Sequence, residues 1–91
     1  MTEIEFNPDK RNLTLADRGL DFLDAPLVFD GTEKTAPDLR FDYPEPRNLT
    51  YGYLHGRLVA VVWTEIANGI RVISMRKANE REQASFQKRM D

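Results

Sequence analysis

Two apolar, β-branched runs joined by a short Asn-Gly connection form the clearest pattern of the chain. They occupy residues 57–65 and 70–77. Such runs predict a β-hairpin whose strands lie in the middle of a sheet. Between residues 58 and 63 every position is apolar, so the first strand is apolar on both faces, as expected of a central strand that helices cover on at least one face. We therefore expect this hairpin to form the centre of the fold.

Alternation of polar and apolar residues predicts the remaining strands. It occurs at residues 3–6, where a short edge strand is expected, and at residues 48–53, where a longer strand should lead into the hairpin. A brief extended piece is expected near residues 32–36. The polar, proline-containing segment that follows, through residue 46, is typical of a loop.

A helix is predicted from Pro8 to Arg18. Asn7 is a good N-cap, proline is tolerated at the first helical position, and Gly19 suits a left-handed C-cap. Leu13, Ala16 and Leu20 recur at helical spacing. We expect these three side chains to face the core.

Two further segments have helical character. Residues 22–29 are densely apolar and follow Asp21, a suitable cap, while Asn79 and Glu82 have the spacing of a capping box for a C-terminal helix. The predicted fold is α+β, with two N-terminal helices packed on a small antiparallel sheet and a C-terminal helix. Residues 1–91 suffice for one domain with one core.

Composition narrows the class of protein. The chain has no cysteine, which removes disulfides and thiolate sites and suits a reducing cytoplasm. The apolar run at residues 58–63 is far shorter than the roughly 20 residues of a membrane span. The N-terminus is acidic, unlike that of a signal peptide. We expect a cytoplasmic protein without a membrane partner.

The charge is unevenly distributed along the chain. Residues 1–46 contain eleven acidic and five basic residues, whereas residues 71–91 contain six basic and three acidic ones. The overall net charge is −2. A basic segment of this kind can bind an anionic polymer locally, although the whole molecule gives little long-range steering.

The residue types present restrict the chemistry. The sequence has no glycine-rich phosphate loop, no Ser-His-Asp set and no metal-ligand spacing, so no metal or cofactor is expected. RNA cleavage requires none of these groups, because the 2′-hydroxyl of the substrate is the nucleophile. The protein must orient it, move protons and stabilise charge on the phosphate. Arginine suits this last role, since its planar fork meets phosphate oxygens in pairs.

Several motifs occur in a specific order along nearly the whole chain. They are Phe-Asn-Pro-Asp-Lys at 6–10, Gly-Leu-Asp-Phe at 19–22, Val-Phe at 28–29, Asp-Tyr at 42–43, Arg47, Gly52, Arg-Val-Ile-Ser-Met-Arg-Lys-Ala at 71–78 and Glu-Arg-Glu at 80–82. With these motifs the chain resembles the BrnT family of small bacterial toxins, the ribonucleases of type II toxin-antitoxin pairs. The motif at 71–78 is the most specific of them.

The resemblance implies an architecture, an activity and partners. The fold would be RelE-like, and the protein would be an endoribonuclease that cleaves mRNA without a cofactor and so arrests translation and growth. Its partner would be a BrnA-like ribbon-helix-helix antitoxin, in a hetero-oligomer. That complex would repress its own operon and bind operator DNA only through the antitoxin.

Six residues are the candidates for the site. The catalytic candidates are Arg76, Arg71 and Arg47. The RNA-binding candidates are Lys10, Lys77 and Tyr51. Tyrosine rings can stack on bases, but alternating tyrosines are also common at the rim of a core.

The arginines have structural alternatives. Arg76 can instead form an ion pair with Glu80 or with an N-terminal carboxylate, and Arg71 can pair with Glu65 across the hairpin. Strand alternation predicts that Arg71 and Arg76 point to opposite faces of the sheet unless a bulge intervenes. Arg76 is then the stronger catalytic candidate. His55 lies in a predicted turn, which makes it a weak candidate for acid-base chemistry.

One departure from the family pattern supports a second hypothesis. The family commonly has a histidine before the glycine that ends the first helix, and here that position is Arg18. Together with the low net charge, this motivates an alternative to the favoured ribonuclease hypothesis, namely a non-catalytic module that holds a ribbon-helix-helix antitoxin and co-regulates their operon. The sequence leaves both hypotheses open.

Overall fold

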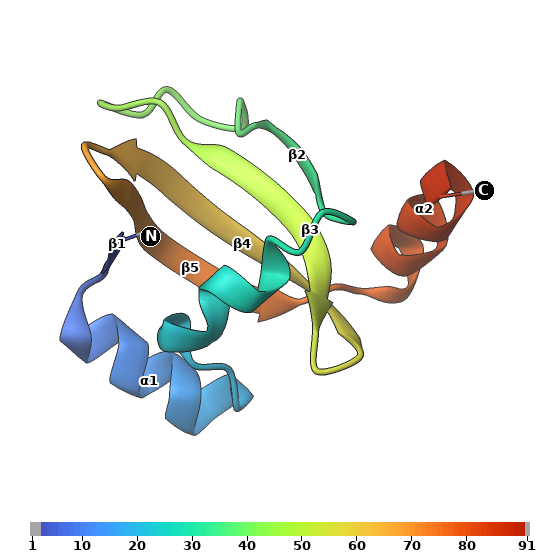
Figure 1. The fold of residues 1–91 in the computed structure, drawn as a ribbon, viewed down its shortest axis with the longest axis horizontal. Helices are drawn as coiled ribbons and strands as arrows, with labels where there is room; N and C mark the ends of the chain where they lie inside the picture. The colour runs from blue at the N-terminus through green and yellow to red at the C-terminus, as the bar shows by residue number, and fades with distance from the viewer. Residues whose placement is uncertain (1–2, 91) are drawn as a thin grey trace.

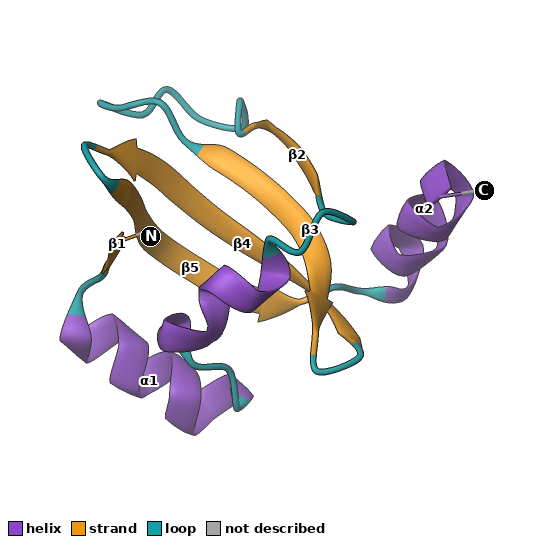
Figure 2. Ribbon diagram, viewed as in Figure 1, coloured by secondary structure: helices purple, strands orange, loops and turns teal. Residues whose placement is uncertain are grey.

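In the computed structural model, which describes residues 3–90, a twisted five-stranded sheet carries two helical segments on one side and a third at one end (Figure 1, Figure 2). The elements in chain order are β1 (Glu3–Glu5), α1 (Pro8–Arg18), η1 (Phe22–Val28), β2 (Lys34–Pro37), β3 (Asn48–Leu54), β4 (Arg57–Ile66), β5 (Gly69–Lys77) and α2 (Glu80–Met90). The element η1 is a 3₁₀-helix.

The sheet is mixed, with strand order β1-β5-β4-β3-β2. Strand β1 is parallel to β5, and the other pairs are antiparallel. The predicted layout, two N-terminal helices on an antiparallel sheet, is therefore wrong. The first element is the strand β1, which lies at the edge of the sheet beside β5. Alternation indicates a strand but not its direction, because side chains have the same period in parallel and antiparallel pairs.

Strand β1 fits against β5 because of a glycine. Residue Glu3 pairs with Gly69, and a Cβ atom at position 69 would lie 1.9 Å from the carbonyl oxygen of Glu3. No side chain can occupy that space. Gly69 therefore has two uses, because it also belongs to the Asn-Gly turn of the central hairpin.

A bulge interrupts the pairing of β4 with β5. Val62 pairs with Ser74, but the next residue of β4, Trp63, pairs with Val72. Ile73 is the extra residue on β5. A bulge of this kind shifts the alternation of side chains by one position from there on.

The bulge places Arg71 and Arg76 on the same face of the sheet. Their partners on β4, Thr64 and Ala60, are four residues apart and so share a face. Met75, in contrast, is fully buried in the core on the other face. The expectation that the two arginines point to opposite faces is wrong, because the extra residue between them restores their alignment.

The main core lies between the sheet and η1. Phe22, Ala25 and Val28 of η1 are fully buried against side chains of β4 and β5. At Gly52 of β3, a Cβ atom would lie 2.6 Å from a Val28 methyl and 2.9 Å from the Val28 carbonyl oxygen. The short helix therefore packs directly on the backbone of β3. Pro26, within η1, is compatible with so short a helix.

Helix α1 begins and ends where the capping residues predicted. The Asn7 side chain accepts hydrogen bonds from the first turn, and Gly19 has φ +69°. The helix buries none of its residues, however, and Leu13 is 70% exposed. The expectation that Leu13 and Ala16 face the core is wrong, and only Leu20, beyond the helix, is buried.

Helix α2 packs at one end of the opposite face of the sheet. Phe86 packs in a small cluster with Leu58 and Ala78, and the Tyr53 ring meets it edge to face with centroids 5.6 Å apart. Asn79 and Glu82 form the predicted capping box, with reciprocal bonds of 2.8 and 2.9 Å.

Candidate functional site

Three of the predicted site residues line one cleft of about 280 Å³. They are Lys10 of α1, Arg47 immediately before β3, and Arg71 of β5. The other residues that line it are Asn7, Glu45, Val72 and Ile73. Three cations from distant parts of the sequence thus surround one space that contains a single lining carboxylate.

The parallel strand β1 creates this cleft. Because β1 pairs with β5 as far as Glu5 and Arg71, the chain leaves the sheet next to the bulge and starts α1 there. Asn7 fixes the start of α1, since its Oδ1 accepts hydrogen bonds from the backbone N–H groups of Asp9 and Lys10 at 2.9 and 3.3 Å. The first helical turn, with Lys10, therefore lies beside β5.

Arg71 has a carboxylate partner in the neighbouring strand. Its Nη1 donates to Glu5 Oε1 at 2.5 Å, and both side chains are about half exposed. The predicted alternative partner, Glu65, is wrong, because Glu5 lies directly opposite Arg71 in the parallel pair. An ion pair this exposed contributes little to stability, so a stronger anion can compete for Arg71.

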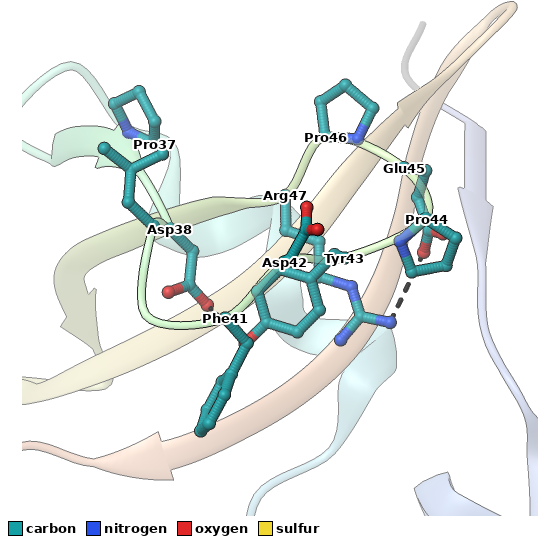
Figure 3. A pocket seen from close by; sticks show the side chains of 10 residues that line it. Pro37, Asp38, Phe41, Asp42, Tyr43, Pro44, Glu45, Pro46 and Arg47 are labelled. Atoms are coloured by element: carbon teal, nitrogen blue, oxygen red, sulfur yellow. Dashed lines mark hydrogen bonds and ion pairs between the residues drawn. The ribbon is translucent and has the colours of Figure 1, made fainter.

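Arg47 contacts an aromatic ring and a carboxylate of the loop that precedes it. Its guanidinium lies over the Tyr43 ring, 4.1 Å from the centroid, and its Nη2 is 3.4 Å from Glu45 Oε1 (Figure 3). Among the described residues, its buried Nε is a side-chain donor without a hydrogen-bond partner. A buried donor that lacks an acceptor in the protein is destabilising, and a water, an ion or a ligand can supply the acceptor.

The loop before β3 is organised around a buried carboxylate. Asp38 accepts hydrogen bonds from Arg40 at 2.8 and 2.9 Å and from the Tyr43 hydroxyl at 3.3 Å. The Arg40 guanidinium holds the pKa of Asp38 at about 2, well below its ordinary value. The Asp38 backbone N–H also donates to the Arg47 carbonyl at 2.8 Å. These bonds close the loop and hold Tyr43 beneath Arg47.

Arg76 and Tyr51 lie in a second group, away from the cleft. Both nitrogens of the Arg76 fork donate to the Glu82 carboxylate at 2.7 Å, and the Tyr51 hydroxyl donates to the same group. Arg76 holds the pKa of Glu82 at about 2, and burial raises the pKa of Tyr51. The partner of Arg76 is Glu82 of α2, and not Glu80 as the alternative proposed.

The remaining candidate, Lys77, is exposed at the end of β5. His55 lies in the β3–β4 turn with φ +50°, and its Nε2 is 3.9 Å from Asp24 Oδ2. Within residues 3–90, no three His, Cys, Asp or Glu side chains come together as metal ligands. In the same part of the chain, no helix is long and apolar enough to cross a membrane.

Sequence reasoning missed Glu45, Tyr43 and Asp38. Glu45 lies two residues before Arg47, which is the spacing that lets the two side chains meet in the loop. Tyr43 belongs to a recognised motif, but its place beneath Arg47 depends on the loop conformation. The role of Asp38 has no signal in the sequence, because any Asp in a polar loop has the same pattern.

Comparison with known proteins adds an independent observation. The family profile described as "Ribonuclease toxin, BrnT, of type II toxin-antitoxin system" matches residues 6–82. The chain belongs to the BrnT family. A crystal structure of the ribonuclease toxin BrnT from Brucella abortus is similar, with a TM-score of 0.69 and 28% sequence identity. The similarity covers 88% of this chain and 100% of that one. No match was found among curated proteins.

The resemblance to BrnT toxins is thereby confirmed. Membership places the chain among ribonuclease toxins of type II toxin-antitoxin systems, and such a toxin has an antitoxin partner. In this BrnT chain, Arg18 stands where the resemblance led us to expect a histidine. Its Nη1 donates to the Met75 carbonyl at 2.8 Å and so fastens the end of α1 to the outer edge of β5.

Proposed function

We propose that this chain is an endoribonuclease that cleaves mRNA without a metal or cofactor and thereby arrests translation and growth. The observation that carries the proposal is the cleft in which Lys10, Arg47 and Arg71 converge. Its cations suit the negative charge of an RNA phosphate. The single contact of Arg47 with Glu45, at 3.4 Å, is weak enough for a phosphate to replace it, which supports the proposal.

The proposed chemistry uses the 2′-hydroxyl of the substrate. Its oxygen attacks the adjacent phosphorus as the bond from phosphorus to the 5′-oxygen breaks, leaving a 2′,3′-cyclic phosphate and a 5′-hydroxyl. Arg47 stabilises the charge that develops on the phosphate oxygens, with Lys10 and Arg71 in support. Glu45, the carboxylate lining the cleft, takes the proton of the 2′-hydroxyl. The departing 5′-oxygen receives a proton from Lys10 or from water.

Arg76, Lys77 and Tyr51 have different places in the proposal. The bidentate bond from Arg76 to Glu82 supports a role in holding α2, and the Tyr51 hydroxyl joins the same group. A direct role of Arg76 on the phosphate stays a prediction, as do the RNA contacts of Tyr51 and Lys77. Comparing Arg76→Ala with the cleft variants separates the two roles, because loss of a structural bond lowers the melting temperature as well as the rate.

Substitution of Arg47 tests the proposed function. We expect Arg47→Ala to lower kcat for RNA cleavage by about 10²- to 10³-fold, because it removes the main stabiliser of the transition-state charge. The measurement is cleavage of RNA by the purified protein, alongside growth after induced expression. Arg81→Ala, which removes an exposed cation outside the cleft, is the matched control and should leave the rate unchanged.

A non-catalytic role is the second candidate. It is favoured by the pairing of Arg71 with Glu5 and of Arg76 with Glu82, which neutralises two of the proposed catalytic cations. In that case the chain would hold its antitoxin and set promoter occupancy. Wild-type protein that leaves RNA intact at high enzyme excess, and whose expression does not slow growth, would contradict the ribonuclease proposal and favour this one.

We further propose that the antitoxin is a BrnA-like ribbon-helix-helix protein, bound in a hetero-oligomer in the bacterial cytoplasm. Exposed leucines on α1 and η1 support a partner surface there; they are Leu13, Leu23 and Leu27. A net charge of −2 disfavours direct binding to DNA. Operator DNA would therefore be bound only through the antitoxin, and the complex would repress its own operon.

A further inference from the structure

The loop at residues 37–47 presents large apolar side chains to solvent next to the cationic cleft. Phe41 is 69% exposed and Leu39 is 84% exposed. The loop encloses a hollow of about 290 Å³ (Figure 3). Exposed apolar side chains that cluster beside a charged cleft are typical of a binding surface.

The loop is held in shape by the bonds around Asp38. They fasten Arg40 and the Tyr43 hydroxyl, one on each side of Phe41. The Phe41 ring meets the Tyr43 ring edge to face, with centroids 5.9 Å apart and an interplanar angle of 75°. An aromatic side chain held in this way loses little conformational entropy when a ligand binds.

The hollow and the cleft adjoin each other. Glu45 and Arg47 line both of them. From Arg47, the contacts run through the Tyr43 ring to Phe41, which is on the outer side. A polymer whose phosphate is bound at Arg47 can therefore extend its next unit over the loop.

We propose that Phe41 is a stacking platform for an unpaired base next to the cleaved phosphate, so that the substrate is single-stranded RNA. The inference rests on the proposed ribonuclease function. Bases of a duplex are stacked on one another and are not available to an aromatic side chain. Stacking accepts every base, so Phe41 should contribute affinity with little sequence preference.

The test combines a protein variant with an altered RNA. A short RNA with one mapped cleavage site is prepared, together with versions that lack the base on one or the other side of that site. We expect Phe41→Ala to raise KM roughly tenfold with little change in kcat, because stacking contributes equally before and during the reaction. Removal of one flanking base should raise the KM of the wild-type protein by a similar factor and leave that of Phe41→Ala unchanged.

Two controls complete the experiment. Phe41→Trp keeps an aromatic face and should retain the KM of the wild-type protein. Leu23→Ala removes a side chain that is 55% exposed on η1, outside both the hollow and the cleft, and should have no effect.

The outcomes separate the inference from the proposed function. If the wild-type protein cleaves RNA and Phe41→Ala has the KM of the wild-type protein on the intact RNA, the platform is contradicted and the loop is a surface for a protein partner. Additive effects of the protein change and the base removal also contradict it. Absence of cleavage by the wild-type protein contradicts the ribonuclease function itself.

Discussion

Arg47 and Arg76 each lie beside a glutamate, yet their bonding differs. Arg76 gives both nitrogens of its fork to Glu82 at 2.7 Å, whereas Arg47 meets Glu45 through one nitrogen at 3.4 Å and keeps an unpaired donor. The fork of Arg76 is thus fully engaged by a carboxylate of the protein, whereas Arg47 has a single, weaker carboxylate contact. On this bonding we propose Arg47 as the main phosphate contact, while the role of Arg76 favoured from the sequence stays a prediction.

The carboxylate of Glu82 should make the stability of the protein depend on pH. Its pKa falls from an ordinary value near 4.5 to about 2 in the folded state, because Arg76 binds the ionised form. The stabilisation is therefore complete above about pH 4.5 and is lost as the pH falls towards 2. Glu82→Gln should lower the free energy of unfolding by about 1 kcal/mol at pH 7 and remove this part of the dependence.

Thermal unfolding of the wild-type protein and the variant from pH 7 to pH 2 measures the effect. Because other carboxylates also titrate in this range, Asp38 among them, the difference between the two proteins is the relevant quantity. The difference in stability between the wild-type protein and Glu82→Gln should become smaller as the pH falls. Glu80→Gln, an exposed position in the same helical turn, is the control. If the stabilities of the wild-type protein and Glu82→Gln fall in parallel with decreasing pH, the role assigned to Glu82 is contradicted.

At the scale of elements, local signals predicted what depends on local chemistry. The caps of α1, the capping box of α2 and the central hairpin all form where the sequence indicates. The direction of β1 and the bulge at Ile73 depend instead on contacts between distant segments, which no local pattern contains. The exposure of α1 has the same origin, because η1 fills the core that α1 was expected to cover.

The packing of η1 on β3 should be sensitive to one added methyl group. Gly52→Ala places a Cβ atom 2.6 Å from a Val28 methyl, and we expect a loss of about 1–3 kcal/mol of stability from overpacking. For a domain of this size, each kcal/mol lowers the melting temperature by about 4–8 °C. Calorimetry measures this change.

A double-mutant cycle with Val28→Ala is the control. Val28→Ala alone should destabilise through lost burial, but in its background Gly52→Ala should cost less, because the nearest atom is gone. Purely additive losses would contradict a direct contact between the two residues.

At the scale of the whole molecule, the candidate site forms where the first helix meets the last strand of the sheet. Lys10 comes from the first helix, Arg47 from a loop and Arg71 from the last strand. The resemblance to BrnT toxins supplied these residues, but nothing in the sequence grouped the three and left Arg76 outside. That grouping follows from the mixed sheet, which brings α1 to β5.

The outer surface of α1 should bind the antitoxin rather than stabilise the fold. We expect Leu13→Asp to change the free energy of unfolding by no more than about 0.5 kcal/mol, since the side chain is 70% exposed. It should weaken binding of the antitoxin about tenfold or more, as a charge in a desolvated contact does. Co-purification and titration with the antitoxin measure the effect.

Leu39→Asp is the matched control, because Leu39 is also an exposed leucine, at 84%, but lies in the loop before β3. It should leave antitoxin binding unchanged. Equal loss of binding in both variants, or unfolding of Leu13→Asp, would contradict the assignment of this surface.

The bulge at Ile73 has a consequence for how this protein can change in evolution. A substitution at position 73 alters one side chain. Deletion of that single codon would instead reverse the face of the sheet to which the β5 side chains before it point. Arg71 would then face the core and Val72 the solvent. Every functional residue would still be encoded, and the cleft would be lost. The number of residues between Arg71 and Met75 must therefore be conserved for the cleft to form. A comparison of residue identities between homologous sequences does not reveal this requirement.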